Sequence, residues 1–174
     1  MTGFPHSEAL HRAGCLLLLL LTGLMACSSR TLPDMQVSRL DGEPFRTAEL
    51  RGQPAWLEFW SPGDPASLQR IRDLPEIVEK LAGTPGRFTL LAVVIAGTSE
   101  ETRQVLEGYS DLPFTVILDS GPLSRELGVR LVPTTIWVQP DGRWQRVRQG
   151  YAEPELLARE IASRIEGLSR PALP

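Results

Sequence analysis

The order of apolar and polar positions predicts a chain in which strands and helices alternate. Two nearly continuous apolar stretches, 55–60 and 88–95, are typical of strands covered on both faces. Between them, apolar residues recur at spacings of three, four and one, which marks one face of a helix. That face consists of Leu68, Ile71, Leu74, Ile77, Val78 and Leu81. Such alternation predicts an α/β layer fold.

Local signals set the expected bounds of the helices. Asp64 followed by Pro65 predicts an N-cap and a first helical turn. Pro75 lies inside this helix and is expected to kink it. A second helix is expected over 99–108, with Ser99 as its cap.

The second half of the chain shows shorter elements of the same kinds, and two short extended pieces precede the first buried strand. The final helix is expected to bury Leu157, Ile161, Ile165 and Leu168. The remaining expected elements are strands at 35–37, from Phe45 and at 114–118, a helix over 122–127 closed by Gly128, a hairpin of 134–138 and 144–149, and the final helix from Pro154.

The N-terminus carries an apolar run that is too short to span a bilayer of about 30 Å comfortably. It is either a signal peptide that is removed or an anchor that stays uncut. Leu24-Met25-Ala26-Cys27 resembles the lipobox of bacterial lipoproteins, which implies cleavage before Cys27 and lipidation of its sulfur and new amine. Several acyl chains anchor a protein stably. The residue after Cys27 is Ser28 and not Asp. In this the chain resembles lipoproteins of Gram-negative bacteria that are anchored in the outer membrane and face the periplasm.

Removal of residues 1–26 would leave little for metal or nucleophilic chemistry. Both histidines and Cys15 lie in this segment, so the mature chain would have no histidine, and its one cysteine would be acylated. This excludes Cys–His and Ser–His nucleophile pairs and the usual zinc, copper and haem ligand sets. We therefore expect no metal and no cofactor. The net charge of −3, without a basic block, argues against nucleic acid as a partner.

These observations predict four regions. Residues 1–26 form a lipoprotein signal peptide, and 27–33 form a lipidated tether. Residues 34–168 form the domain, and 169–174 form a C-terminal tail.

Three segments, in this order and spacing, resemble the thioredoxin superfamily, most closely its envelope-anchored TlpA and ResA type. Residues 59–63, Phe-Trp-Ser-Pro-Gly, resemble the Phe-Trp-Ala lead-in to the family's active site. Residues 128–135 resemble the Gly-Val-x-x-x-Pro-Thr loop, and 137–142 resemble the strand and Asp-Gly turn that follow it. The resemblance implies a thioredoxin-like fold, a central mixed sheet flanked by helices, from about Pro33 to Leu168.

The redox cysteines of that family are missing. Its Cys-x-x-Cys begins four residues after the tryptophan, which places Asp64 and Ser67 at the two positions. The position of Pro75 allows a second register, with Ser67 and Arg70 there. Neither register supplies a thiol, and thiol–disulfide exchange needs a thiolate and a second sulfur. We therefore expect no catalytic residue, with Asp64 as a helix cap and Ser67 as an inert helix serine.

Glu58 falls where thioredoxins place a buried acid beneath their cysteines. Because an unpaired buried carboxylate is costly, Glu58 either points to a strand edge or pairs with an arginine or Lys80. The alternative is a relic or reused acid.

The resemblance also implies a cis peptide bond between Val132 and Pro133. In the family, the backbone before this proline pairs with an extended peptide. An apolar peptide groove would then be lined by Trp60, Pro62, Gly63, Leu131, Val132 and Pro133. In the alternative, Trp60 packs into the core and Pro133 only shapes a turn.

The sequence leaves three functions open. The leading hypothesis is a membrane-anchored, redox-inactive thioredoxin-like domain that binds a protein or peptide in the cell envelope. The second is a thiol–disulfide oxidoreductase of the TlpA or ResA type, which the missing cysteines oppose. The third is a structural part of an envelope complex.

Overall fold

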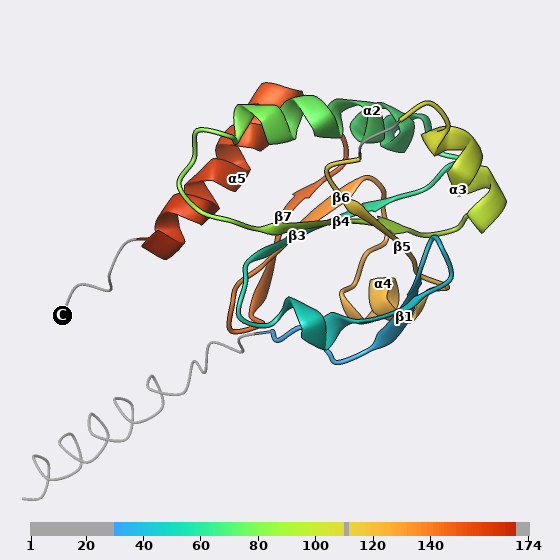
Figure 1. Ribbon diagram of the computed structural model, residues 1–174, viewed down its shortest axis with the longest axis horizontal. Helices are drawn as coiled ribbons and strands as arrows, with labels where there is room; N and C mark the ends of the chain where they lie inside the picture. Colours follow the sequence, from blue (N-terminus) through green and yellow to red (C-terminus); the bar gives the residue numbers. More distant parts are fainter. Residues whose placement is uncertain (1–29, 110–111, 170–174) are drawn as a thin grey trace, which may run out of the picture.

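The computed structural model describes residues 30–109 and 112–169, which form one mixed sheet with helices on both faces (Figure 1). The seven strands lie in the order β2-β1-β5-β4-β3-β6-β7. The strands are β1 (Gln36–Arg39), β2 (Pro44–Arg46), β3 (Ala55–Trp60), β4 (Thr89–Val94), β5 (Thr115–Leu118), β6 (Thr134–Val138) and β7 (Trp144–Gln149). The helices are the 3-10 helix η1 (Thr47–Leu50), α2 (Pro65–Lys80), α3 (Ser99–Leu106), α4 (Pro122–Glu126) and α5 (Pro154–Ser169).

The centre of the sheet is parallel and its flanks are antiparallel. β3 pairs in parallel with β4, and β4 with β5, while β6 runs antiparallel to β3. All six residues of β3 are buried, including Glu58, as its nearly continuous apolar pattern predicted. The predicted bounds of β3, β6 and β7 are confirmed, and so is the predicted mixed sheet flanked by helices.

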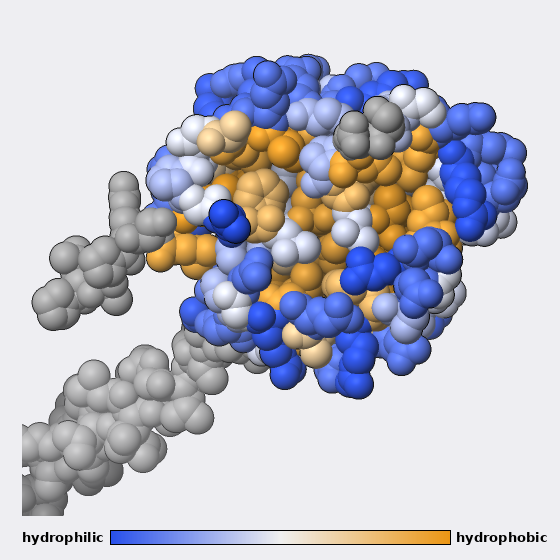
Figure 2. All heavy atoms as spheres, in the orientation of Figure 1, coloured by the Kyte–Doolittle hydropathy of each residue, from blue (hydrophilic) through white to orange (hydrophobic). Residues whose placement is uncertain are grey.

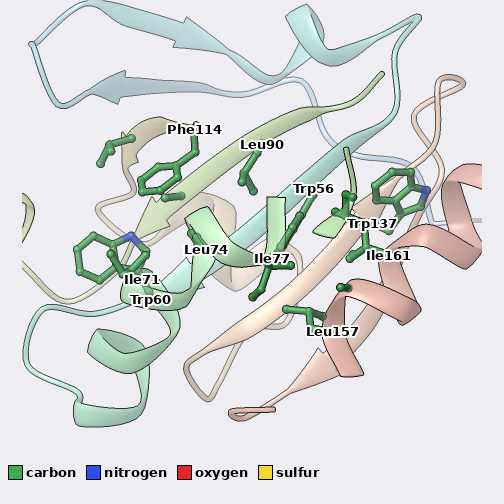
Figure 3. Packing of buried hydrophobic residues seen from close by; sticks show 14 of the residues in the cluster. Trp56, Trp60, Ile71, Leu74, Ile77, Leu90, Phe114, Trp137, Leu157 and Ile161 are labelled. Carbon is green, nitrogen blue, oxygen red and sulfur yellow. The ribbon is translucent and has the colours of Figure 1, made fainter. Parts of the chain in front are cut away.

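Two apolar layers hold the helices to the sheet. α2, α3 and α5 cover one face, while η1 and α4 cover the other (Figure 1). Figure 3 shows Ile71, Leu74 and Ile77 of α2 packed in the first layer with Trp56 of β3. In Figure 2, polar residues surround an apolar region at the level of the sheet, between these helix layers.

Some local predictions were wrong. Thr98, not Ser99, caps α3, because its hydroxyl accepts a hydrogen bond from the Glu101 N–H, while the Glu101 carboxylate accepts one from the Thr98 N–H. Leu168, predicted to be buried, is 40% exposed near the C-terminal end of α5. The 3-10 helix η1 was not predicted. The prediction that Pro75 lies inside a helix is confirmed, because α2 continues through it to Lys80.

The described chain is hydrogen-bonded to the domain from its first residue. The Trp144 N–H donates to the Arg30 carbonyl at 2.9 Å, and the Leu32 N–H donates to the Gly142 carbonyl at 2.8 Å. Leu32 is buried. Part of the predicted tether 27–33 therefore pairs with the β6–β7 hairpin.

The signal-peptide and Cys27 predictions lie outside the described residues, as does 170–174. Within the described part, none of the helices is long and apolar enough to cross a membrane. The same part holds no cluster of His, Cys, Asp or Glu suited to a metal ion.

Candidate functional site

The sheet register brings the two predicted site segments to one end of the molecule. β3 and β6 are antiparallel, and Phe59, near the end of β3, pairs with Thr134, the first residue of β6. The loop that leads from β3 to α2 and the loop before β6 therefore leave the sheet at the same end. The peptide bond between Val132 and Pro133 in the second loop is cis, as the family resemblance implied.

Asp64 and Ser67 lie at the start of α2. Asp64 is the N-cap, and its Oδ2 accepts a hydrogen bond from the Ser67 N–H at 2.7 Å. The Ser67 side chain is fully buried, and its hydroxyl has no hydrogen-bond partner among the described residues. The arrangement supplies a helix cap and an enclosed hydroxyl, without a base to activate it.

Glu58 is fully buried in β3 and pairs with an arginine. Its Oε1 lies 3.2 Å from Nε of Arg70, whose side chain is also fully buried. Its Oε2 accepts hydrogen bonds from Trp56 Nε1 at 2.8 Å and from Thr135 Oγ1 at 2.7 Å. Lys80 pairs instead with Glu76 and Glu155 at the surface. The buried pair and its hydrogen bonds thus join β3, α2 and β6. They lie next to the loop that contains the cis Val132–Pro133 bond, which we call the cis-proline loop.

Burial and partners act on Glu58 in opposite directions. Desolvation raises the pKa of the Glu58 carboxyl, while the charge of the adjacent Arg70 and the hydrogen bonds from Thr135 and Trp56 lower it. Desolvation is the largest of these influences, so the pKa is above its ordinary value. The folded protein therefore holds a proton on Glu58 more readily than the unfolded chain does.

A second set of polar contacts extends this network along α2 towards α5. The Tyr151 hydroxyl donates to Asp73 Oδ2 at 2.8 Å, and Gln69 Nε2 donates to Asp73 Oδ1 at 2.8 Å. The guanidinium carbon of Arg70 lies 5.2 Å from the centre of the Tyr151 ring. Desolvation and the Asp73 carboxylate raise the pKa of Tyr151 to about 12.

The sequence prediction missed Asp73 and Tyr151 and named Arg70 only in the alternative register. One signal was available: Ser67, Arg70 and Asp73 recur every three residues and so follow the edge of the helix's apolar stripe. Nothing in the sequence pointed to Tyr151.

The predicted groove is smaller in the structure than the resemblance implied. Trp60 lies fully buried in the core, so the prediction that it lines a groove is wrong. Pro133 is also buried. Leu131 is 63% exposed, the most exposed large apolar side chain among the described residues. Gly63 is exposed, while Pro62 and Val132 are partly buried.

The cis-proline loop is fixed on both sides of Val132. The Pro133 carbonyl accepts from the Gly150 N–H at 2.7 Å, and the Leu131 carbonyl accepts from Thr134 Oγ1 at 2.6 Å. Among the described residues, no hydrogen bond uses the N–H or the carbonyl of Val132. One peptide donor and one acceptor are thus left open next to the exposed Leu131.

Comparisons with known proteins give structural matches. Neither a family model nor a curated protein matches the chain. DsbF of Mycobacterium tuberculosis, described in mixed oxidized and reduced forms, is 26% identical with a TM-score of 0.65, over 76% of this chain and 98% of that one. A putative thioredoxin of Neisseria meningitidis is 27% identical with a TM-score of 0.62, over 79% and 92%.

A third structure shows the fold alone. A putative thiol:disulfide interchange protein DsbE of Chlorobium tepidum is 20% identical with a TM-score of 0.66, over 79% of this chain and 96% of that one. By its fold, the chain is a member of the thioredoxin superfamily.

Proposed function

We propose that this protein is a lipid-anchored, redox-inactive thioredoxin-like domain that binds an extended segment of a protein partner in the cell envelope. The binding site is the loop that presents Leu131 and Val132. One observation carries the proposal: the exposed Leu131 stands beside Val132, whose backbone N–H and carbonyl are both unused among the described residues.

The loop offers the two kinds of contact that strand addition needs. An extended segment can accept a hydrogen bond from the Val132 N–H and donate one to its carbonyl, and each such bond contributes about 0.5–1.5 kcal/mol net. Covering the exposed Leu131 adds an apolar contact, with an upper limit of about 1.5–3 kcal/mol for complete burial. Neither contribution requires a thiol.

The sequence argues against the redox chemistry named for the similar structures. Cys15 and Cys27 are the only cysteines. Cleavage before Cys27 and acylation of its sulfur leave the domain without a thiolate, and exchange needs two sulfurs on the enzyme. A thiol–disulfide oxidoreductase remains the alternative function, because the DsbF and DsbE structures share this fold.

We place the domain in the bacterial cell envelope. The leader at 1–26 and the lipobox at Cys27 support export and membrane anchoring, and the absence of Asp after Cys27 favours the periplasmic face of the outer membrane in a Gram-negative cell. Replacing Cys27 with Ser should release the protein from the membrane fraction. If the variant stays firmly bound, an uncut apolar anchor holds it instead.

The partner site is tested with matched leucine variants. The full-length protein is cross-linked in cells, partners are identified by mass spectrometry, and recovery is compared for Leu131→Asp and Leu156→Asp. Leu156 on α5 is 37% exposed, so both substitutions are expected to change folding stability by less than about 0.5 kcal/mol. Loss of the partner from Leu131→Asp alone supports the proposal, and equal recovery from both variants contradicts it.

A further inference from the structure

The described chain begins at Arg30, beside the turn between β6 and β7 at one end of the sheet. We propose that this end rests on the headgroups of the bilayer that holds the lipid anchor, and that anionic lipids stabilise the contact. The inference rests on the proposed lipidation of Cys27. We call this end the entry surface; it consists of Arg30, Thr31, Arg51, Arg143 and Trp144.

The short connection to Cys27 leaves the domain little freedom. Arg30 is three residues after Cys27, so an extended chain spans at most about 11 Å between them. From Arg30 onwards the chain is fixed, because its carbonyl accepts from the Trp144 N–H and the Leu32 N–H donates to Gly142. A polar headgroup layer is about 5–7 Å thick on each side of the bilayer. An anchor at Cys27 therefore holds the entry surface within reach of that layer.

Further contacts bring a second loop to the same end. The Gly52 N–H donates to the Pro140 carbonyl at 2.9 Å, which places neighbouring Arg51 beside the β6–β7 turn. Arg51 and Gly142 also line one small hollow together with Leu32. Figure 1 shows the start of the described chain beside this turn, on the same side of the molecule.

The side chains of the entry surface suit a membrane interface. Trp144 is partly buried, and the Arg30 guanidinium carbon lies 5.6 Å from its ring centre. Tryptophan and arginine are both favoured at the headgroup level, where an apolar body meets a polar layer.

The charge of this end is positive. Arg143 pairs with Asp141 at 2.6 Å, and nearby Asp34 pairs with Arg46 at 2.6 Å. Arg30 and Arg51 are exposed and form no ion pair with the described residues, so this end carries two uncompensated positive charges. An anionic bilayer attracts basic groups. Each arginine near its surface raises the ratio of bound to free protein by a factor of about five.

In this orientation, the proposed binding loop with Leu131 and Val132 lies at the end of the domain far from the membrane. β6 runs from Thr134, next to the Leu131 loop, to Val138, next to the entry surface. The four residue steps from Thr134 to Val138 span about 13 Å. With the entry surface on the headgroups, the Leu131 loop faces the aqueous compartment, where a protein partner can reach it.

Tryptophan fluorescence reads this contact directly. Trp56 and Trp60 are fully buried and Trp137 is 1% exposed, so Trp144 is the tryptophan that lipids can reach. The full-length lipoprotein is reconstituted into phosphatidylcholine vesicles that contain phosphatidylglycerol and a lipid spin-labelled at its headgroup. We expect quenching in the parent protein and none in Trp144→Phe. The emission of Trp144 is the difference between the parent protein and Trp144→Phe. If this emission is the same with and without the spin label, the proposal is overturned.

Mass spectrometry separates this failure from failure of the anchor. If Cys27 carries no lipid, the proposed anchoring is wrong; if it carries lipid and Trp144 is unquenched, only the docking is wrong.

Charge variants test the role of anionic lipid. Arg30→Gln and Arg51→Gln should each lower the ratio of docked to undocked protein about fivefold. Arg72→Gln on α2, which removes an exposed arginine elsewhere, should leave quenching unchanged. Equal quenching in all three variants overturns the contribution of anionic lipid.

Discussion

Removing Arg70 while keeping Glu58 should be among the most damaging single substitutions in this protein. Both side chains are fully buried, and Arg70 Nε lies 3.2 Å from the Glu58 carboxylate. Arg70→Met keeps the approximate length and apolar stem of the side chain but leaves a buried carboxylate without its cation. Breaking a buried ion pair by removing one partner costs about 3–5 kcal/mol. A domain is stable by only about 5–15 kcal/mol, so the loss is easily measured.

A second substitution distinguishes lost charge pairing from lost packing. In Glu58→Gln with Arg70→Met, no charge is buried, and the side-chain carbonyl oxygen of the new glutamine can still accept from Trp56 and Thr135. Replacing both members of a buried pair is often close to neutral. We expect the double variant to recover most of the stability that Arg70→Met loses.

The pH dependence follows from the direction of the Glu58 pKa. Burial raises this pKa above its ordinary value of 4.5, so the native state binds the proton more tightly than the unfolded chain. The contribution of this group is fully present below its unfolded pKa and is lost as pH rises through its folded pKa. The charge of Arg70 lowers the pKa of Glu58, so removing Arg70 raises this pKa further. The pH range between the unfolded and the folded pKa of Glu58 therefore becomes wider. The difference in unfolding free energy between Arg70→Met and the parent protein should therefore be smaller in acid than at neutral pH.

Urea unfolding of the soluble domain from Ser28, at neutral pH and at about pH 5, measures both effects. The difference from the parent protein is compared at each pH, because other carboxylates also titrate. A loss below about 1 kcal/mol for Arg70→Met, or no recovery in the double variant, would refute the reasoning about the buried pair.

Two further predictions concern the positions of the missing thiols. The domain from Ser28 contains no cysteine, so insulin reduction should not exceed the rate without protein; a clear rate above that background would contradict the redox-inactive proposal. Asp64→Cys with Ser67→Cys should form a disulfide across the first turn of α2, as shown by loss of free thiol on oxidation, since bridging needs Cα atoms within about 7 Å. If that pair stays reduced while cysteines at positions 67 and 70 oxidise, the second register is correct.

The strands and main helices could be predicted because local signals and burial agree there. The nearly continuous apolar run at 55–60 predicts a buried strand, the Asp64-Pro65 pair predicts a helix start, and the structure confirms both. The cap of α3 was misplaced because Thr98 and Ser99 are both good caps. Only the position of Glu101, three residues after Thr98, distinguishes them.

The candidate site was less predictable because it depends on contacts between distant segments. The sequence offered an arginine among several partners for Glu58, but the choice of Arg70 depends on how α2 packs over β3. Tyr151 reaches Asp73 across 78 positions of sequence, a contact that no local pattern encodes. Trp60 was assigned to a groove by resemblance, whereas its position at the end of a fully buried strand places it in the core.

Photo-cross-linking in intact cells tests the central claim most directly. A photoreactive amino acid is placed at Leu131 or, as the matched control, at Leu156, in the full-length lipoprotein with Cys27 unchanged. The proposed function predicts that position 131 gives a discrete cross-linked partner and that position 156 does not. It also predicts that Leu131 cross-linking is the same under oxidising and reducing conditions. Absence of any partner at position 131, or the same products at both positions, would contradict a binding site at the cis-proline loop.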